Sequence, residues 1–354
     1  MNVAVIGIGN GGQAIAGHLA INGHNVSLYG RNQAIVDRLN QKGGIQLEGC
    51  ISGFGKINII TTDISKVIKG ADVIMIVTTA NGHHELASIL TSYLETDQII
   101  VLNPGRTGGA FEFRNVLMNN GFTKNVYIVE AQTLVYACRI IENGLVNIIG
   151  VKEKVFIASY PSSDRVYIED KLHHLYNSFI CVDNVLITSF ENIGAVFHPS
   201  VILFNAASIE RGHSFYFYRN MTSSIADFIE LLDEERLQLG KSYGIDLIKV
   251  RDWISYAYSG VEGDSLQERM KSNPAYYDIH APKSIRCRQI LEDIPMGIVP
   301  LLGFGKVANV PMPLFIALLN ICSSLLGIDF LKEGRTLKRM GFQDYSLNEI
   351  IKSV

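Results

Sequence analysis

The chain has 354 residues, a formal net charge of −3, 47% hydrophobic residues and 18% charged residues. This length predicts two domains, the apolar content excludes a disordered chain, and the absence of a basic run argues against nucleic acid or an anionic membrane as a partner. The five cysteines are scattered without a CxxC pair, which predicts reduced thiols in a cytoplasmic protein rather than a disulfide or zinc framework.

The N-terminal stretch joins a short apolar run to a helical pattern through a glycine-rich loop. Asn2–Ile6 predicts a strand, Gln13–Asn22 a helix and Asn25–Tyr29 a second strand, and the loop after the first strand fits G-x-G-x-x-G. Such glycines permit a tight turn, a close backbone approach to a pyrophosphate, and close packing of the helix on the sheet. The residues expected to contact a dinucleotide here are Gly7, Gly9, Asn10, Gly11 and Gly12.

The tip of the second predicted strand bears on the choice between NAD and NADP. An NAD site usually places Asp or Glu about 20 residues beyond the glycine loop, to hold the ribose 2′-hydroxyl. This chain instead has Gly30, Arg31 and Asn32. Because an arginine attracts a 2′-phosphate, the pattern favours NADP(H), with Arg31 and Asn32 at the adenosine end. NAD(H) stays the alternative if Arg31 is only a solvated surface residue.

The rest of the first half alternates β-rich runs with helical segments, which predicts an α/β, Rossmann-type, doubly wound and mostly parallel sheet. The β-rich runs are Ile57–Asp63, Asp72–Ala80, Gln98–Gly105 and Asn125–Thr133, and further β-like runs continue to about Phe190. Ligands of such sheets bind at the carboxyl ends of the strands. The residues expected at the edge of the cofactor site are therefore Thr78, Thr79, Asn103 and Gly105. No metal site is expected.

Beyond about residue 189 the texture changes to long helical stretches, at Asn192–Arg211, Thr222–Tyr243 and Pro313–Leu326. We therefore expect a dinucleotide-binding domain at residues 1–188 and an all-α substrate domain at residues 189–354. The apolar run Met312–Phe330 is interrupted by polar residues, so we expect a buried core helix and not a membrane span.

The first long helix of the second half carries Asn192, His198 and Asn205, and the latter two are seven residues apart, so their side chains can share a face. Pro199 indicates a kink or a helix start. A carboxylate beside a histidine fixes its tautomer and makes it a good acid/base, and Asp293 is the candidate partner. Residue types alone leave open that His198 is a satisfied core histidine and Asp293 a turn cap.

Several motifs give the chain a resemblance to the opine dehydrogenases, the octopine/nopaline dehydrogenase family, and most of all to the bacterial N-(1-D-carboxyethyl)-L-norvaline dehydrogenase type. They are the glycine loop, "NPGRTGGAFEFR" at residues 103–114, "FHPSVILFNAA" at residues 197–207 and "EDIPMGIVPL" at residues 292–301.

The resemblance implies an NAD(P)-dependent oxidoreductase acting on CH–NH bonds. Such an enzyme condenses an α-keto acid, typically pyruvate, with an L-amino acid, and reduces the imine to a secondary-amine dicarboxylate. The family's catalytic histidine falls on His198, its partner aspartate on Asp293 and an arginine on Arg288. We expect Arg288 to clamp a carboxylate or pyrophosphate and to help close the cleft, and Asn192 and Asn205 to make further polar contacts.

Two other functions remain possible from the sequence. A 2-hydroxyacid or ketopantoate-type dehydrogenase usually relies on a lysine as its acid, and the stretch Glu191–Gly212 contains none. A non-catalytic NADP(H) sensor would combine the glycine loop with a disabled catalytic pair, whereas both His198 and Asp293 are present. The apolar helix near the C-terminus is expected to serve a homodimer.

Overall fold

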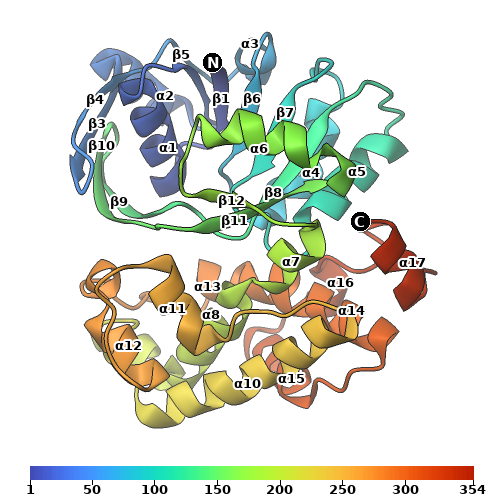
Figure 1. The fold of residues 1–354 in the computed structure, drawn as a ribbon. Coiled ribbons are helices and arrows are strands. Elements are labelled where there is room, and N and C mark those ends of the chain that lie inside the picture. The colour runs from blue at the N-terminus through green and yellow to red at the C-terminus, as the bar shows by residue number, and fades with distance from the viewer. The chain divides into compact units, whose positions relative to one another are not determined.

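The computed structural model describes all 354 residues and divides them into two compact units. The first unit comprises Met1–Gly105 and Phe113–Val185, and the second comprises Arg106–Glu112 and Leu186–Val354. Composition indicated a change near residue 189 but gave no sign that the short segment Arg106–Glu112 belongs with the second unit. Figure 1 labels most of the helices and strands of both units.

The first unit contains an eight-stranded sheet in the order β12-β11-β8-β7-β6-β1-β2-β5. All neighbouring strands pair in parallel except β11, which runs antiparallel to β8. This arrangement confirms the predicted Rossmann-type sheet. The strands are β1 (Asn2–Ile6), β2 (Asn25–Tyr29), β5 (Ile59–Thr61), β6 (Val73–Ile76), β7 (Ile99–Leu102), β8 (Tyr127–Ala131), β11 (Val155–Tyr160) and β12 (Phe179–Cys181).

A second sheet, which the sequence did not predict, has the strand order β4-β3-β10-β9. It pairs β10 with β3 in parallel, although about a hundred residues separate the two strands in the chain. The strands are β3 (Gly44–Gly49), β4 (Gly53–Lys56), β9 (Tyr136–Glu142) and β10 (Leu145–Val151). Helix α1 (Asn10–Ile21) packs against this sheet as well as against β2.

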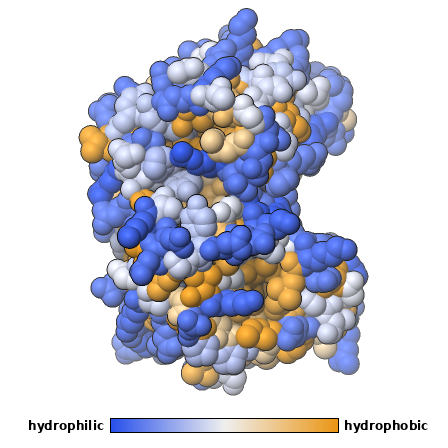
Figure 2. Space-filling view, turned by 90° about the vertical axis from the view of Figure 1, so that its right-hand side faces the viewer, coloured by the Kyte–Doolittle hydropathy of each residue, from blue (hydrophilic) through white to orange (hydrophobic).

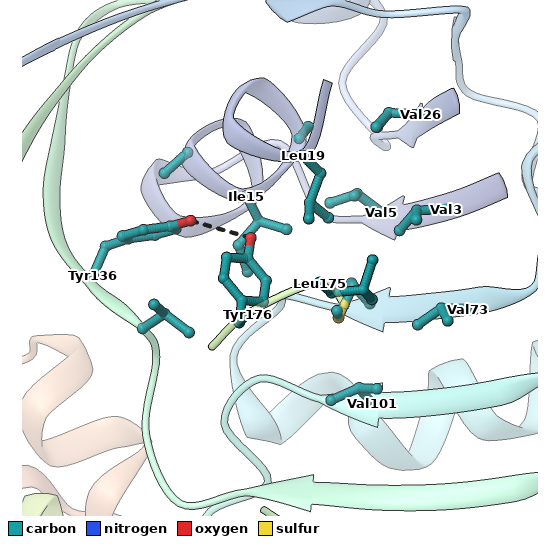
Figure 3. Close-up of a cluster of buried hydrophobic side chains, with 14 of the residues drawn as sticks. Val3, Val5, Ile15, Leu19, Val26, Val73, Val101, Tyr136, Leu175 and Tyr176 are labelled. Atoms are coloured by element: carbon teal, nitrogen blue, oxygen red, sulfur yellow. Dashed lines mark hydrogen bonds between the residues drawn. The ribbon is translucent and has the colours of Figure 1, made fainter. Parts of the chain in front are cut away.

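The core of the first unit joins α1, both sheets and the segment around Tyr176 (Figure 3). Most of its members are fully buried aliphatic side chains, which stabilise the fold by removal of apolar surface from water. Two phenols lie within it, and Tyr136 donates a hydrogen bond of 3.1 Å to Tyr176. Burial raises the pKa of both hydroxyls, so this pair stays neutral.

The first unit also contains six short helical segments besides α1. They are α2 (Gln33–Lys42), α3 (Ile64–Ile68), η1 (Ala80–Gly82), α4 (His83–Leu90), η2 (Ser162–Asp164) and α6 (Arg165–His173). Helix α5 (Gly109–Asn119) contains the boundary between the units, since Glu112 and Phe113 belong to different ones. The run Val185–Phe190, expected to be β-like, is helix α7, because a short apolar run does not by itself distinguish a buried helix from a strand.

The second unit is helical, as predicted, apart from an isolated bridge between Tyr216 and His280. Its longer helices are α8 (Ile193–Phe204), α10 (Ser223–Ser242), α11 (Val250–Ala257), α14 (Val299–Ala308) and α15 (Pro313–Leu326). Its shorter segments are α9 (Ala206–Glu210), α12 (Leu266–Ser272), η3 (Pro274–Tyr276), α13 (Arg288–Leu291), η4 (Ile294–Ile298), α16 (Phe330–Glu333) and α17 (Leu347–Lys352).

Two details of this unit differ from the expectation. Helix α8 begins at Ile193 and Pro199 lies inside it, so the proline does not mark the helix start. The helical stretch expected to run to Arg211 breaks at Asn205, which ends α8 and precedes α9. The stretch Val185–Phe204 is apolar and long enough to cross a membrane, but 83% of its most apolar window is buried inside the protein, as in a core helix.

Candidate functional site

The glycine loop of the first unit is shaped by close contacts that only glycine tolerates. Gly7 has φ +124°, and a Cβ there would lie 2.5 Å from the carbonyl oxygen of Val77. A Cβ on Gly12 would lie 1.9 Å from the carbonyl oxygen of Gly7. By contrast, a Cβ on Gly9, which caps the N-terminus of α1, would meet nothing within 4 Å. Two glycines therefore permit the packing, and the third leaves open space at a helix N-terminus, where phosphates bind.

Polar atoms without a protein partner lie at the ends of the neighbouring strands. The hydroxyl oxygen of Thr78 and the side-chain oxygen of Asn103 are both buried, and neither has a hydrogen-bond partner within the protein. The Thr78 methyl lies 3.4 Å from the position of a Cβ on Gly7, so this side chain borders the glycine loop. Buried polar atoms of this kind normally have a partner. The loop and these orphaned atoms therefore fit a dinucleotide cofactor.

Other predicted cofactor residues have structural contacts of their own. Asn10 accepts a hydrogen bond of 2.7 Å from the backbone N–H of Ile140 in β9, so its side chain ties the loop to the second sheet. Gly11 leaves room for Leu134, which would lie 2.9 Å from a Cβ there. Gly105 is required because a Cβ would lie 2.3 Å from Glu130, and Thr79 is exposed at the start of η1.

An exposed arginine follows the tip of β2. The Arg31 side chain is 82% exposed and lies 3.9 Å from the Glu85 carboxylate, which is a weak surface contact. Asn32 caps α2 by accepting from the backbone N–H of Ile35 at 3.2 Å. Gly30 packs so closely on Ile8 that a Cβ would lie 2.2 Å from it. No carboxylate stands at this strand tip on β2 itself, so Arg31 is available to an anion.

In the second unit, the structure brings His198 and Asp293 together, although 95 residues separate them in the chain. His198 Nδ1 lies 2.8 Å from Asp293 Oδ2, and His198 Nε2 lies 3.0 Å from the Tyr218 hydroxyl. His198 is on α8, and Asp293 directly precedes the π-helical segment η4. Because an ionised carboxylate only accepts, Nδ1 donates to Asp293 and Nε2 is the nitrogen left for proton exchange.

Arg106 supplies the counter-charge to this pair. Its guanidinium lies 3.2 Å from Asp293 Oδ1 and 3.1 Å from Glu292 Oε2, and all three side chains are buried. Asn192 joins the cluster by accepting from Arg106 at 3.4 Å and donating to Thr107 at 3.2 Å. One oxygen of the Asp293 carboxylate therefore faces the Arg106 guanidinium, and the other faces the His198 imidazole.

These contacts decide the protonation state of the buried carboxylate. Burial alone would raise the pKa of Asp293, but Arg106, then His198, then Arg288 outweigh burial and lower the pKa to about 2. Burial likewise opposes the charge of Arg106, yet Asp293, Glu292 and Tyr218 together raise its pKa. The cluster therefore keeps an ionised acceptor beside His198 Nδ1, which holds that ring nitrogen as the donor.

Two predicted residues of the second unit remain, Arg288 and Asn205. Arg288 is half-exposed and lies 2.9 Å from Glu292 Oε2, so part of its guanidinium stays open to an anion. Asn205 donates 2.9 Å to the carbonyl of Val201 at the end of α8 and has no recorded contact with His198. The polar contact expected from Asn205 to a substrate or cofactor stays a prediction. The role of Arg288 in domain closure stays a prediction.

Sequence reasoning assigned no role to Arg106, Tyr218 or Glu292. Arg106 and Glu292 each lie within a motif that carries the family resemblance, and Glu292 is also one of two adjacent acidic residues. These two features were the signals available in the sequence. Arg106 and Glu292 are 186 residues apart, and nothing local predicts their contact. Tyr218 lies in "SFYFYRN", an aromatic run typical of core packing.

Family models match both units. Residues 2–106 match the N-terminus of NAD-dependent glycerol-3-phosphate dehydrogenase, and residues 181–326 match the α-helical domain of NAD/NADP octopine/nopaline dehydrogenase. The chain is similar to an opine dehydrogenase of Arthrobacter sp. (strain 1C), at 36% identity over 340 residues that cover 96% of this chain and 94% of the relative. It is also similar to an octopine dehydrogenase of Mizuhopecten yessoensis, at 25% identity, with 84% and 79% of the two chains covered.

Solved structures share the fold. A structure of octopine dehydrogenase with NADH and L-arginine matches with a TM-score of 0.80 and 22% identity, covering 99% of this chain and 98% of that chain. A structure of yersinopine dehydrogenase with bound NADP⁺ matches with a TM-score of 0.74 and 13% identity, covering 100% and 99%.

Proposed function

This chain belongs to the opine dehydrogenase family of NAD(P)-dependent oxidoreductases acting on CH–NH bonds, and from this premise we propose its reaction in detail. The reaction is the reductive condensation of an L-amino acid with an α-keto acid. We propose pyruvate as the keto acid, and His198 with Asp293 as the acid/base pair. The observation that carries the pair is the 2.8 Å contact between His198 Nδ1 and a buried, ionised Asp293.

The residues of the second unit supply proton transfer and orientation. The cofactor, when bound, supplies the hydride, so the protein has to deliver a proton and hold the substrates. Asp293 fixes the orientation of the imidazole, so that Nε2 is the nitrogen that exchanges the proton. Both substrates carry carboxylates, and the half-exposed guanidinium of Arg288 is suited to a bidentate contact with one of them.

For the cofactor we propose a preference for NADP(H), with NAD(H) also accepted. Arg31 is exposed at the strand tip, where a 2′-phosphate would bind, and only the weak contact with Glu85 competes for it. Arg31→Ala should weaken NADPH binding about tenfold or more, because it removes a charge-assisted hydrogen bond, and should leave NADH binding nearly unchanged. Fluorescence titration of both cofactors measures this, with the exposed Arg38→Ala on α2 as the control. Equal losses for both cofactors would contradict the 2′-phosphate contact.

We further propose a cytoplasmic homodimer. The five cysteines are all free thiols, which suits a reducing compartment. Helix α15 exposes Ile321 and Leu325, which are four residues apart and share one face of the helix. Figure 2 shows apolar patches among the hydrophilic surface in view. Light scattering of the purified protein, with Ile321→Lys as the variant, tests whether this side of α15 joins two copies.

The reaction is tested by following NADPH and NADH consumption with pyruvate and a panel of L-amino acids. Dependence on both substrates supports the proposal. Turnover with pyruvate alone would instead indicate a 2-hydroxyacid dehydrogenase, and tight cofactor binding without turnover on any pair would indicate a sensor.

The acid/base role has its own variant. His198→Asn should lower kcat by about 10²–10⁴-fold, the usual contribution of a positioned acid/base, and should spare cofactor binding. His213→Asn, at an exposed position of the same unit, is the control. An unchanged kcat in His198→Asn removes this residue from the mechanism.

A further inference from the structure

The Tyr218 hydroxyl lies beside His198 Nε2, the nitrogen proposed above to exchange the proton. It is 3.0 Å from His198 Nε2, while Asp293 engages the other ring nitrogen. When the imidazole is neutral, Tyr218 donates to Nε2, and when the imidazole is charged, Nε2–H donates to the Tyr218 oxygen. In both states the phenol is a direct partner of the reacting nitrogen.

Aromatic packing fixes the phenol ring in this position. Tyr218 stacks on Tyr276 with ring centroids 4.2 Å apart and planes inclined by 18°. Phe217 and Phe197 contact the same ring edge-on, at 4.7 and 5.9 Å. Tyr276 is itself buried and packs edge-on against Tyr258 at 5.2 Å. Moving the hydroxyl away from Nε2 would break these contacts, so it stays between the imidazole and any group that approaches Nε2 along the same line.

Two further features suit the phenol to proton transfer. Tyr218 is only half-buried, so part of its surface reaches solvent and is open to a small molecule. Arg106 lies close enough to interact with the phenol electrostatically, since Asp293, Glu292 and Tyr218 raise the pKa of Arg106 against the effect of burial. The arrangement forms a chain of hydrogen-bonded groups from Asp293 through His198 to Tyr218.

We propose that Tyr218 is a catalytic residue that relays the proton from His198 Nε2 to the substrate oxygen that leaves as water. The relay rests on the proposed function and acts when the adduct of amine and keto acid loses its hydroxyl. The C–O bond breaks, the oxygen takes the proton of Tyr218, and Tyr218 takes the proton of the charged imidazole. The nitrogen lone pair forms the C=N bond, so an iminium, water and a neutral imidazole result.

The sharpest variant is Tyr218→Phe, which keeps the ring stack and removes only the hydroxyl. It is assayed with pyruvate and the L-amino acid that the panel selects. We expect kcat to fall about 10²-fold, with KM changed less than about threefold, since the lost contact acts in the proton-transfer step. Tyr216→Phe is the matched control, because Tyr216 contacts His280 and Arg219 rather than His198.

A second measurement distinguishes a proton relay through Tyr218 from a purely structural role, in which its hydroxyl only holds the His198 ring in place. In the reverse direction, mixing the secondary-amine product with NADP⁺ gives a fast absorbance burst from hydride transfer, followed by slow hydrolysis of the iminium. The relay predicts that Tyr218→Phe keeps the burst and slows the later phase. The relay would be wrong if Tyr218→Phe slowed both phases by the same factor, or if it changed neither phase.

If Tyr218→Phe does not fold, as judged by the fluorescence of the single tryptophan, a fluorotyrosine at position 218 preserves the shape and lowers the phenol pKa. The relay then predicts that the alkaline limb of the pH profile of kcat moves to lower pH, and an unmoved limb refutes it.

The assays also separate the relay from the proposed function. Wild-type inactivity on every substrate pair would refute the reaction and the relay together. Wild-type turnover matched by Tyr218→Phe would refute the relay alone.

Discussion

Removal of the Arg106 guanidinium tests the electrostatic account of the second unit. In Arg106→Met the chain keeps a long side chain at the same backbone position, but Glu292 and Asp293 lose a partner at 3.1 and 3.2 Å. The Arg106 side chain is 8% exposed and its two partners are 3% and 0% exposed, so water does not replace it. Breaking a buried ion pair in this way costs about 3–5 kcal/mol. The two contacts do not double this cost, because Glu292 keeps Arg288 and Asp293 keeps His198.

The assay is urea unfolding followed by the fluorescence of Trp253, the single tryptophan, which is buried in α11 of the same unit. We expect the free energy of unfolding to fall by about 3–5 kcal/mol. Arg251→Met is the control, since its contact with Glu230 spans 3.5 Å between side chains that are 38% and 34% exposed. Such a pair is worth about 0–1 kcal/mol. If Arg106→Met proves no more costly than Arg251→Met, the stabilising role assigned to Arg106 is wrong.

Three further predictions concern the glycine loop, a second buried carboxylate and stability at low pH. Gly12→Ala places a Cβ 1.9 Å from the Gly7 carbonyl oxygen, and such overpacking costs about 1–3 kcal/mol. We expect it to distort the loop and to weaken NADPH binding about tenfold or more in a fluorescence titration, and unaltered binding would contradict the tight turn. Glu112→Gln leaves Arg335 and Arg339 without their carboxylate and should cost about 3–5 kcal/mol in the Trp253 assay, and a loss under 1 kcal/mol would speak against it. Because folding lowers the pKa of Asp293 to about 2, its stabilisation is present above about pH 4 and lost as pH falls toward 2, so Asp293→Asn should flatten this slope.

The sequence predicted those features that short-range patterns encode. The strand-loop-helix unit at the N-terminus, the alternating β and α segments and the helical second half each follow from local periodicity, and the structure confirms the fold class. The pairing of β10 with β3, the helix at Val185–Phe190 and the bond between Asn10 and β9 were not predicted. Each depends on which distant segment packs alongside, and a short apolar run does not encode this.

The candidate site shows the same division. The glycine spacing predicts which backbone groups would face a phosphate, and the family motifs pointed to His198 and Asp293. Arg106 lies within a family motif, but nothing local indicated its contacts, because its partners Glu292 and Asp293 are nearly two hundred residues away. Tyr218 was hidden in an aromatic run, and its polar tip is significant only because Nε2 of His198 lies beside it.

The segment Arg106–Glu112 has a consequence for recombining this protein with its relatives. It comes from the first half of the chain, yet Arg106 contacts the Asp293 carboxylate and Glu112 contacts Arg335 in the second unit. A chimera spliced once near residue 186 would therefore combine the second unit with a foreign version of these seven residues. A chimera that keeps these ion pairs needs two crossovers, so that the segment Arg106–Glu112 is transferred together with the second unit.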